Sequence, residues 1–265
     1  MSASLEPITR LIAHRGNAFE FPENTLPALG SALQLGIRHI EFDVHLSADG
    51  IPVVMHDDRL NRCAGLDLDA LAMRCDELKA ISVHEPSRFG DRFVGTTIPT
   101  LAEAVELLKQ FPEAIAFVEI KRASLRRFGT ELVVRKVCEE LHTVASQVVI
   151  ISFDLDALLQ VKRNYALPIG WVLSEYSLQA KQLAETHSPS FLFCNQDKLP
   201  ADSSVLWPGM WRWAIYEVTN ISEANALMAR DAHLLETMQV SKLLHELSKP
   251  SHYPESTVNL KIIHD

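Results

Sequence analysis

Short runs of apolar and β-branched residues alternate along the chain with longer segments whose apolar residues recur three and four positions apart. The first pattern predicts buried strands, and the second predicts helices that bury one face. The expected strands are 11–14, 37–44, 115–120, 148–152, 169–173, 191–194, 213–218 and 234–236. The expected helices are 25–35, 101–111, 128–141, 154–165, 178–186 and 222–229. Suitable N-cap residues stand at the start of three of them: Thr100 with Glu103, Asp154, and Ser222.

This alternation of strands and helices indicates a parallel sheet whose strands are joined by crossover helices. Eight such strands in a chain of 265 residues favour a TIM (β/α)8 barrel over an open doubly wound sheet. We therefore expect one barrel domain over residues 1–265.

Two stretches depart from the alternation. Asp49-Gly50 lies between two apolar runs, which is a hairpin signal, so residues 51–55 are expected to return antiparallel beside the second strand and to end at His56. Residues 59–97 contain polar turns and one short helical pattern, 70–81, but no strand–helix unit. We expect these residues to form a small insertion on the rim of the barrel, as a lid or wall of a pocket.

Charge and composition narrow the partners of the protein. The net charge of −9 argues against nucleic acid, which requires concentrated positive charge, but allows a small phosphorylated molecule in a local pocket. The first ten residues have no apolar signal-peptide core, and no apolar run approaches the roughly 18 residues of a membrane span. The four cysteines form no CxxC pair, so reduced thiols are expected. We expect a cytoplasmic protein without a stable membrane anchor; its oligomeric state is left open.

Charged side chains cluster where the expected strands end, which is where barrel enzymes place their active sites. The first strand ends at His14 and Arg15, and the hairpin return ends at His56. Glu41 and Asp43 share one face of the second strand because side chains alternate along a strand. Glu119 and Lys121 share one face of the third barrel strand, while Phe42, Val44 and Ile120 point to the outer helices. Charges that point into a barrel mouth must be paired or must bind a ligand.

These residue types together indicate chemistry on a phosphate ester. Three carboxylates, Glu41, Asp43 and Glu119, suit a hard dication such as Mg²⁺ or Ca²⁺. Two histidines, His14 and His56, can donate and accept protons near neutral pH. Two cations, Arg15 and Lys121, can hold an anion, and this combination fits phosphoryl-ester chemistry better than redox or acyl chemistry. His45 shares a face with Asp43 and remains a possible bystander in the pocket.

The chain resembles the glycerophosphodiester phosphodiesterases in the order and spacing of five segments. These are AHRGNAFEFPENTLPAL, GIRHIEFDVHLSADGIPVVMHDDRLNR, IPTLAEAVELL, VEIK and SFD. The resemblance implies a TIM barrel with a small insertion after the His-Asp motif. It also implies one divalent cation on Glu41, Asp43 and Glu119, His14 and His56 as an acid–base pair, and Arg15 and Lys121 near the phosphate.

The same resemblance gives the residues that follow the first expected strand local roles. Gly16 is expected to let the backbone turn tightly beside the bound group. Glu23 is expected to reach Arg15 or the metal shell, and Asn24 or Thr25 to cap the first helix.

The late strands depart from the family pattern. The family usually has Trp-Thr-Val-Asn on its seventh strand, where this chain has Tyr216-Glu217-Val218-Thr219. The last strand usually ends in Thr-Asp, where this chain has Leu234-Leu235-Glu236-Thr237. The metal and histidine half of the site is thus retained, and the half that would hold the alcohol portion is altered.

The resemblance implies hydrolysis of a glycerophosphodiester to glycerol 3-phosphate and an alcohol. Two alternatives are a related barrel phospholipase of the D type that acts on lysophospholipids, and a catalytically silent barrel that binds a phosphoester. For hydrolysis, we assign His14 to the attacking group and His56 to the leaving group.

Overall fold

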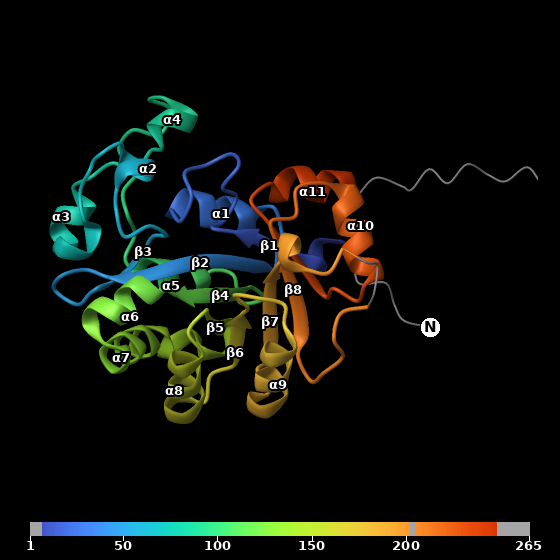
Figure 1. Ribbon diagram of the computed structural model, residues 1–265. Helices are drawn as coiled ribbons and strands as arrows, with labels where there is room; N and C mark the ends of the chain where they lie inside the picture. The colour runs from blue at the N-terminus through green and yellow to red at the C-terminus, as the bar shows by residue number, and fades with distance from the viewer. Residues whose placement is uncertain (1–6, 202–204, 248–265) are drawn as a thin grey trace, which may run out of the picture.

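The computed structural model describes residues 7–201 and 205–247, and its centre is a closed barrel of eight parallel strands (Figure 1). The barrel strands are β1 (Leu11–His14), β2 (His39–Leu46), β4 (Ile115–Ile120), β5 (Val148–Ser152), β6 (Ile169–Val172), β7 (Phe191–Asn195), β8 (Arg212–Tyr216) and β9 (Leu234–Thr237). They follow one another around the barrel in chain order, and β1 closes it by pairing with both β2 and β9. The TIM barrel expected from the sequence is therefore confirmed.

One further strand, β3 (Pro52–Val54), lies outside the parallel barrel. It pairs antiparallel with β2, with Val54 opposite Val44 and Val53 opposite His45. The hairpin expected at Asp49-Gly50 is confirmed, and it brings the chain back to the C-terminal end of the barrel just before His56.

Helices surround the barrel, as Figure 1 shows for α7, α8 and α9 beneath the sheet in that view. The longer helices are α1 (Leu26–Gln34), α5 (Leu101–Leu108), α7 (Thr130–Leu141), α8 (Leu155–Tyr165), α9 (Leu178–His187), α10 (Ile221–Ala229) and α11 (Val240–Leu247). A shorter helix, α6 (Arg122–Phe128), precedes α7 and was not expected; Gly129 separates the two with a φ of +87°, a backbone conformation that favours glycine.

Two of the three predicted helix caps are observed. Thr100 and Glu103 form a capping box at α5, and Asp154 accepts a hydrogen bond from the backbone N–H of Ala157 at α8. Ser222 was a wrong assignment, because the side chain of Asn220 accepts from the N–H of Glu223 and caps α10. Asn220 lies two residues before Ser222, and it takes the N-cap position because the helix already begins at Ile221.

Two apolar layers hold the barrel together. The inner layer fills the barrel with residues from alternate strand positions, among them Ile12, Phe117, Val149, Phe193 and Leu234. The outer layer lies between the strands and the helices, and it contains Phe42, Val44 and Ile120, as strand alternation predicted. The charged neighbours of these three residues in sequence consequently point into the barrel mouth.

The segment between β3 and α5 contains only short elements in the described chain. These are α2 (Asn61–Ala64), a 3-10 turn (Ala70–Ala72), α3 (Cys75–Lys79) and α4 (Pro86–Phe89), which Figure 1 places together at the upper left. A small apolar cluster, which includes Leu60, Leu78 and Ile98, packs beneath them. Across residues 7–201 and 205–247, no helix has the length and apolarity that a membrane crossing requires.

Candidate active site

The end of β1 turns sharply after His14. Arg15 has a φ of +56° and Gly16 a φ of +80°, so two successive residues adopt the left-handed region. A Cβ atom at Gly16 would lie 2.5 Å from the carbonyl carbon of Ala28, on the backbone of α1. Glycine is therefore required here for both its φ and its close approach to the first helix. Thr25 caps that helix by accepting a hydrogen bond from the N–H of Ala28 at 3.3 Å.

Strand register brings the predicted carboxylates together. His14 on β1 lies opposite Glu41 on β2, and Asp43 on β2 lies opposite Glu119 on β4. One carboxylate oxygen from each of Glu41, Asp43 and Glu119 lies within 4.8 Å of the others. Because parallel neighbours in register present side chains at the same height, three residues from two strands form one cluster.

Two basic side chains flank this carboxylate cluster. The Nζ atom of Lys121 lies 3.2 Å from Oδ1 of Asp43 and 3.1 Å from Oε1 of Glu119. The Nε atom of Arg15 lies 3.3 Å from Oδ2 of Asp43, and its Nη1 donates to Glu23 at 2.8 Å. The expected reach of Glu23 to Arg15 is thus observed. Both cations lie beside the carboxylates and line the same pocket as the cluster.

The carboxylates of the cluster differ in proton affinity. Burial alone raises the pKa of Asp43, but Lys121 and Arg15 outweigh it and hold that pKa well below its usual range. Burial, followed by the charge of Asp43, raises the pKa of Glu41 well above its usual range. Burial also raises the pKa of Glu119, which Lys121 opposes. Without a further positive charge, the cluster holds more negative groups than its two cations neutralise.

The donor set fits a hard divalent cation. All three side chains offer carboxylate oxygens, which Mg²⁺ and Ca²⁺ prefer. The Oε1 atom of Glu41 is buried and has no hydrogen-bond partner in the described chain. A buried carboxylate oxygen without a donor is costly, and a bound cation would remove that cost.

The second histidine, His56, contacts the carboxylate of the next residue, Asp57. Its Nδ1 atom lies 2.6 Å from Oδ1 of Asp57, so its Nε2 atom is left for the pocket. His45 does not line this pocket; its ring lies 2.8 Å from the hydroxyl of Ser124 and 3.0 Å from the carbonyl oxygen of His56. Burial lowers the pKa of His45 to about 4, so this ring supports the His56 loop as a neutral group.

One pocket at the barrel mouth collects the predicted residues and adds others. It is lined by His14, Arg15, Glu41, His56, Glu119, Lys121, Ile151, Phe153, Val172, Phe193, Tyr216, Glu217 and Glu236. Asp43 lies beneath this lining, 1% exposed. Tyr216 at the end of β8, Glu217 just after it and Glu236 on β9 were noted in the sequence only as departures, yet they form one wall of the pocket.

Glu236 is the residue that sequence reasoning missed most clearly. It is 3% exposed, and its Oε1 atom lies 3.4 Å from Nε2 of His14. Strand alternation from Leu234, which packs inside the barrel, already places Glu236 on the inner face. That signal is the same one that identified Glu41 and Asp43.

Comparisons with known proteins agree with this geometry. A family model described as "Glycerophosphoryl diester phosphodiesterase family" matches residues 14–201. A protein named glycerophosphodiester phosphodiesterase from Caldanaerobacter subterraneus subsp. tengcongensis is 34% identical over 58% of this chain and 62% of its own length. A protein of the same name from Bacillus altitudinis is 33% identical over 57% of this chain and 60% of its own length. The match thus spans less than two thirds of either relative.

Among solved structures, a phosphodiesterase from Oleispira antarctica, in complex with the product sn-glycerol-3-phosphate, has a TM-score of 0.78 and 26% identity. The alignment covers 91% of this chain and 97% of that one. A putative glycerophosphodiester phosphodiesterase from Galdieria sulphuraria has a TM-score of 0.76 at 16% identity, which supports the fold alone.

Proposed function

Since the chain belongs to the glycerophosphoryl diester phosphodiesterase family, we propose that it hydrolyses glycerophosphodiesters to glycerol 3-phosphate and an alcohol. The observation that carries the proposal is the cluster of Glu41, Asp43 and Glu119 at one pocket that His14 and His56 also line, with Asp43 beneath the lining. Carboxylates for a dication and two separated imidazoles are the groups that cleavage of a phosphodiester requires.

Glu41, Asp43 and Glu119 would hold one divalent cation, Mg²⁺ or Ca²⁺. When bound, that cation supplies positive charge that stabilises the negative charge developing on the phosphate oxygens. Arg15 and Lys121 line the same pocket and would bind the phosphate oxygens as hydrogen-bond donors. Their ion pairs with Asp43 and Glu119 hold both side chains in place before the substrate arrives.

His14 and His56 would move the protons. Nε2 of His14 accepts the proton of the attacking hydroxyl, whether that group is the 2-hydroxyl of glycerol or water. The attacking oxygen bonds to phosphorus, the bond between phosphorus and the oxygen of the alcohol breaks, and that oxygen takes a proton from His56. Attack by water gives glycerol 3-phosphate directly, whereas attack by the 2-hydroxyl gives a cyclic phosphate that a water molecule then opens to glycerol 3-phosphate. Asp57 bonds to Nδ1 of His56 at 2.6 Å, which fixes the ring and leaves Nε2 to face the pocket.

Product analysis tests the proposed activity. The purified protein, with Mg²⁺ or Ca²⁺, is incubated with glycerophosphocholine, glycerophosphoethanolamine, glycerophosphoglycerol and lysophospholipids, and free glycerol 3-phosphate is measured enzymatically. We expect release from at least one glycerophosphodiester and none from the Glu119→Gln variant. Release of choline from lysophospholipids alone would favour the phospholipase alternative, and no turnover of any diester would favour a silent barrel.

A further inference from the structure

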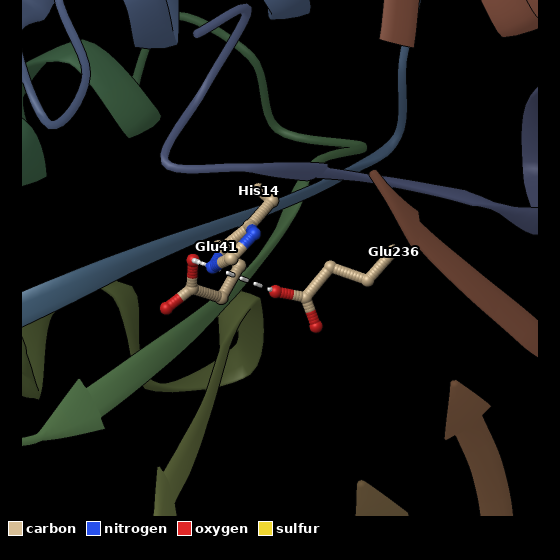
Figure 2. Close-up of side chains that lie close together, drawn as sticks. All are labelled: His14, Glu41 and Glu236. Carbon is tan, nitrogen blue, oxygen red and sulfur yellow. Dashed lines mark ion pairs between the residues drawn. The ribbon is translucent and has the colours of Figure 1, made fainter. Parts of the chain in front are cut away.

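A second set of donor atoms lies beside the carboxylate cluster. Figure 2 shows the side chains of His14, Glu41 and Glu236 pointing toward one another from three different strands. Nε2 of His14 lies 3.4 Å from Oε1 of Glu236 and 3.8 Å from Oε2 of Glu41. One ligand atom from each residue lies within 4.8 Å of the others.

The spacing of these atoms fits a bound ion better than direct hydrogen bonds. Protein hydrogen bonds from nitrogen to oxygen span about 2.7–3.2 Å, so both separations are too long. Ligands held at about 2.1 Å around a tetrahedral Zn²⁺ lie about 3.4 Å from one another. The separation between His14 and Glu236 matches that value, and the separation between His14 and Glu41 exceeds it slightly.

The imidazole of His14 is a buried polar group without a hydrogen bond to the described chain. His14 is 8% exposed, and its Nδ1 atom is buried with no partner. Its Nε2 atom is directed between the two carboxylates (Figure 2). A ring that makes no hydrogen bond in the described chain and whose Nε2 is aimed into a pair of buried carboxylates is the arrangement a cation would complete.

Glu236 lacks a permanent cation of its own. Within residues 7–201 and 205–247, no lysine or arginine forms an ion pair with it, whereas Asp43 and Glu119 both pair with Lys121. Glu236 is 3% exposed, so water compensates little of its charge. A buried carboxylate whose ion-pair partner in the described chain is a histidine, which is charged only when protonated, is costly unless a positive charge is bound there.

We propose that His14, Glu41 and Glu236 form a second divalent-cation site, which shares Glu41 with the first and takes a borderline ion such as Zn²⁺. One imidazole nitrogen and two carboxylates are a donor set that zinc accepts in proteins, whereas the all-oxygen cluster suits Mg²⁺ or Ca²⁺. The two clusters therefore differ in the ion that their donor atoms suit. Glu41 can serve both because its Oε2, which accepts from the backbone N–H of Arg15 at 3.1 Å, also faces His14, while its Oε1 makes no hydrogen bond within the described residues.

Occupation of this second site has a consequence that rests on the proposed function. The lone pair of Nε2 of His14 cannot bind an ion and accept a proton at the same time. Zn²⁺ should therefore inhibit an enzyme that Mg²⁺ or Ca²⁺ activates, and Glu236 should determine the sensitivity. Glu236 contributes no ligand to the first cluster, so its substitution should weaken Zn²⁺ binding at the second site and leave Mg²⁺ or Ca²⁺ binding at the first site intact.

The test is residue-specific, because the chain has eleven histidines and four cysteines that could bind zinc elsewhere. Zn²⁺ is titrated into protein held in excess Mg²⁺, and the ring nitrogens of His14 are followed by NMR on histidine-labelled protein. We expect the chemical shift of Nε2 of His14 to change as Zn²⁺ saturates the protein. An unchanged His14 signal at saturating Zn²⁺ would overturn the proposal without any variant.

Matched variants measure the contribution of Glu236. In the Asp43→Asn background, which removes a ligand of the first cluster alone, Glu236→Gln should weaken Zn²⁺ binding at least tenfold by calorimetry. Glu217→Gln, from the same pocket wall, should leave it within twofold. Equal affinity in the Glu236→Gln and Glu217→Gln variants would contradict the second site.

These results stay separate from the test of the proposed function. Zn²⁺ binding at His14 in a protein that cleaves no diester would retain the cation site and reject the phosphodiesterase. Diester cleavage that Zn²⁺ inhibits equally in wild type and Glu236→Gln would retain the phosphodiesterase and reject the cation site.

Discussion

The guanidinium of Arg62 donates to both carboxylate oxygens of Glu23, at 2.6 and 2.7 Å. Glu23 also accepts from Arg15 at 2.8 Å, and Arg62 also donates to Asp57 at 2.8 Å. Asp57 in turn holds His56. A continuous set of ion pairs thus joins the turn after β1 to the loop that carries His56, and Arg62 from α2 lies at its centre.

Glu23→Gln should lower stability in a way that depends on pH. Burial alone raises the pKa of Glu23, but Arg62 and Arg15 outweigh it and hold that pKa below its usual range. Such a carboxylate stabilises the fold above its unfolded pKa, near 4.5, and this stabilisation is lost as pH falls through the folded pKa. We expect a loss of about 2 kcal/mol at pH 7, less than for a fully buried pair because Arg62 is partly exposed.

Thermal unfolding of wild type and Glu23→Gln between pH 7 and pH 3 checks this expectation. The gap in Tm should narrow as the pH falls below about 4.5. Glu106→Gln, which removes an exposed pair with Lys109, serves as the control and should shift Tm little at any pH. A gap that stays constant down to pH 3 would mean that the charge of Glu23 is not what stabilises the fold.

Gly16→Ala should be far more damaging than Gly50→Ala. Both glycines have a positive φ, +80° and +76°, so both substitutions cost about 1 kcal/mol of backbone strain. A Cβ atom added at Gly16 would lie 2.5 Å from a backbone atom of α1, whereas a Cβ atom added at Gly50 would meet nothing within 4 Å. Urea unfolding should show a loss of more than about 3 kcal/mol for Gly16→Ala. Similar losses for both variants would show that the close approach to α1 is not required.

Much of this architecture could be predicted from the sequence because local signals and the fold agree. The strand over residues 115–120 and the capping box at Thr100 depend only on nearby residues, and both are observed. Helices α6 and α11 were not predicted from the sequence. α6 is short and ends at Gly129, and α11 follows the last strand closely. Periodicity over one or two turns is a weak signal.

The candidate site also has a part that the sequence predicts and a part that only the fold reveals. Glu41, Asp43 and Glu119 could be proposed as one cluster because each alternates with apolar residues in the C-terminal part of an expected strand, which places its side chain on the inner face. Whether they meet depends on register, which the pairing of Asp43 with Glu119 provides and which the sequence does not state. The contact of Glu236 with His14 depends on barrel closure between β9 and β1, over 222 residues of sequence separation, and no local pattern reports it.

Glu41→Gln, Asp43→Asn and Glu119→Gln should each lose most of the diesterase activity and bind Mg²⁺ or Ca²⁺ more weakly, with the fold retained. Each amide keeps the size of the side chain and removes a charge. Metal-free Glu41→Gln should be at least as stable as metal-free wild type, because burial already disfavours the charge on Glu41. Calorimetry with Mg²⁺ or Ca²⁺ provides the affinities, with Glu217→Gln as control. Wild-type affinity in Glu119→Gln would remove that residue from the metal site.

The leaving group should separate the two histidines. An alkoxide needs a proton as it departs, so His56→Ala should lose about two to four orders of magnitude in kcat on an alkyl diester. A p-nitrophenolate departs without a proton, so His56→Ala should be much less impaired on a p-nitrophenyl diester. His14→Ala should be impaired on both substrates. The reverse pattern would exchange the two assignments, and equal losses on both substrates for both variants would assign the leaving-group proton to another group, such as Lys121.

Release of glycerol 3-phosphate before and after removal of divalent cations tests the proposed function most directly. Glu41, Asp43 and Glu119 offer three carboxylate oxygens and their cluster contains no cysteine, so the proposed ion is a hard one that a chelator can extract. Protein dialysed against EDTA should lose its activity on a glycerophosphodiester, and added Mg²⁺ or Ca²⁺ should restore it. Full activity in excess chelator, with no metal found by elemental analysis, would contradict a metal-dependent phosphodiesterase.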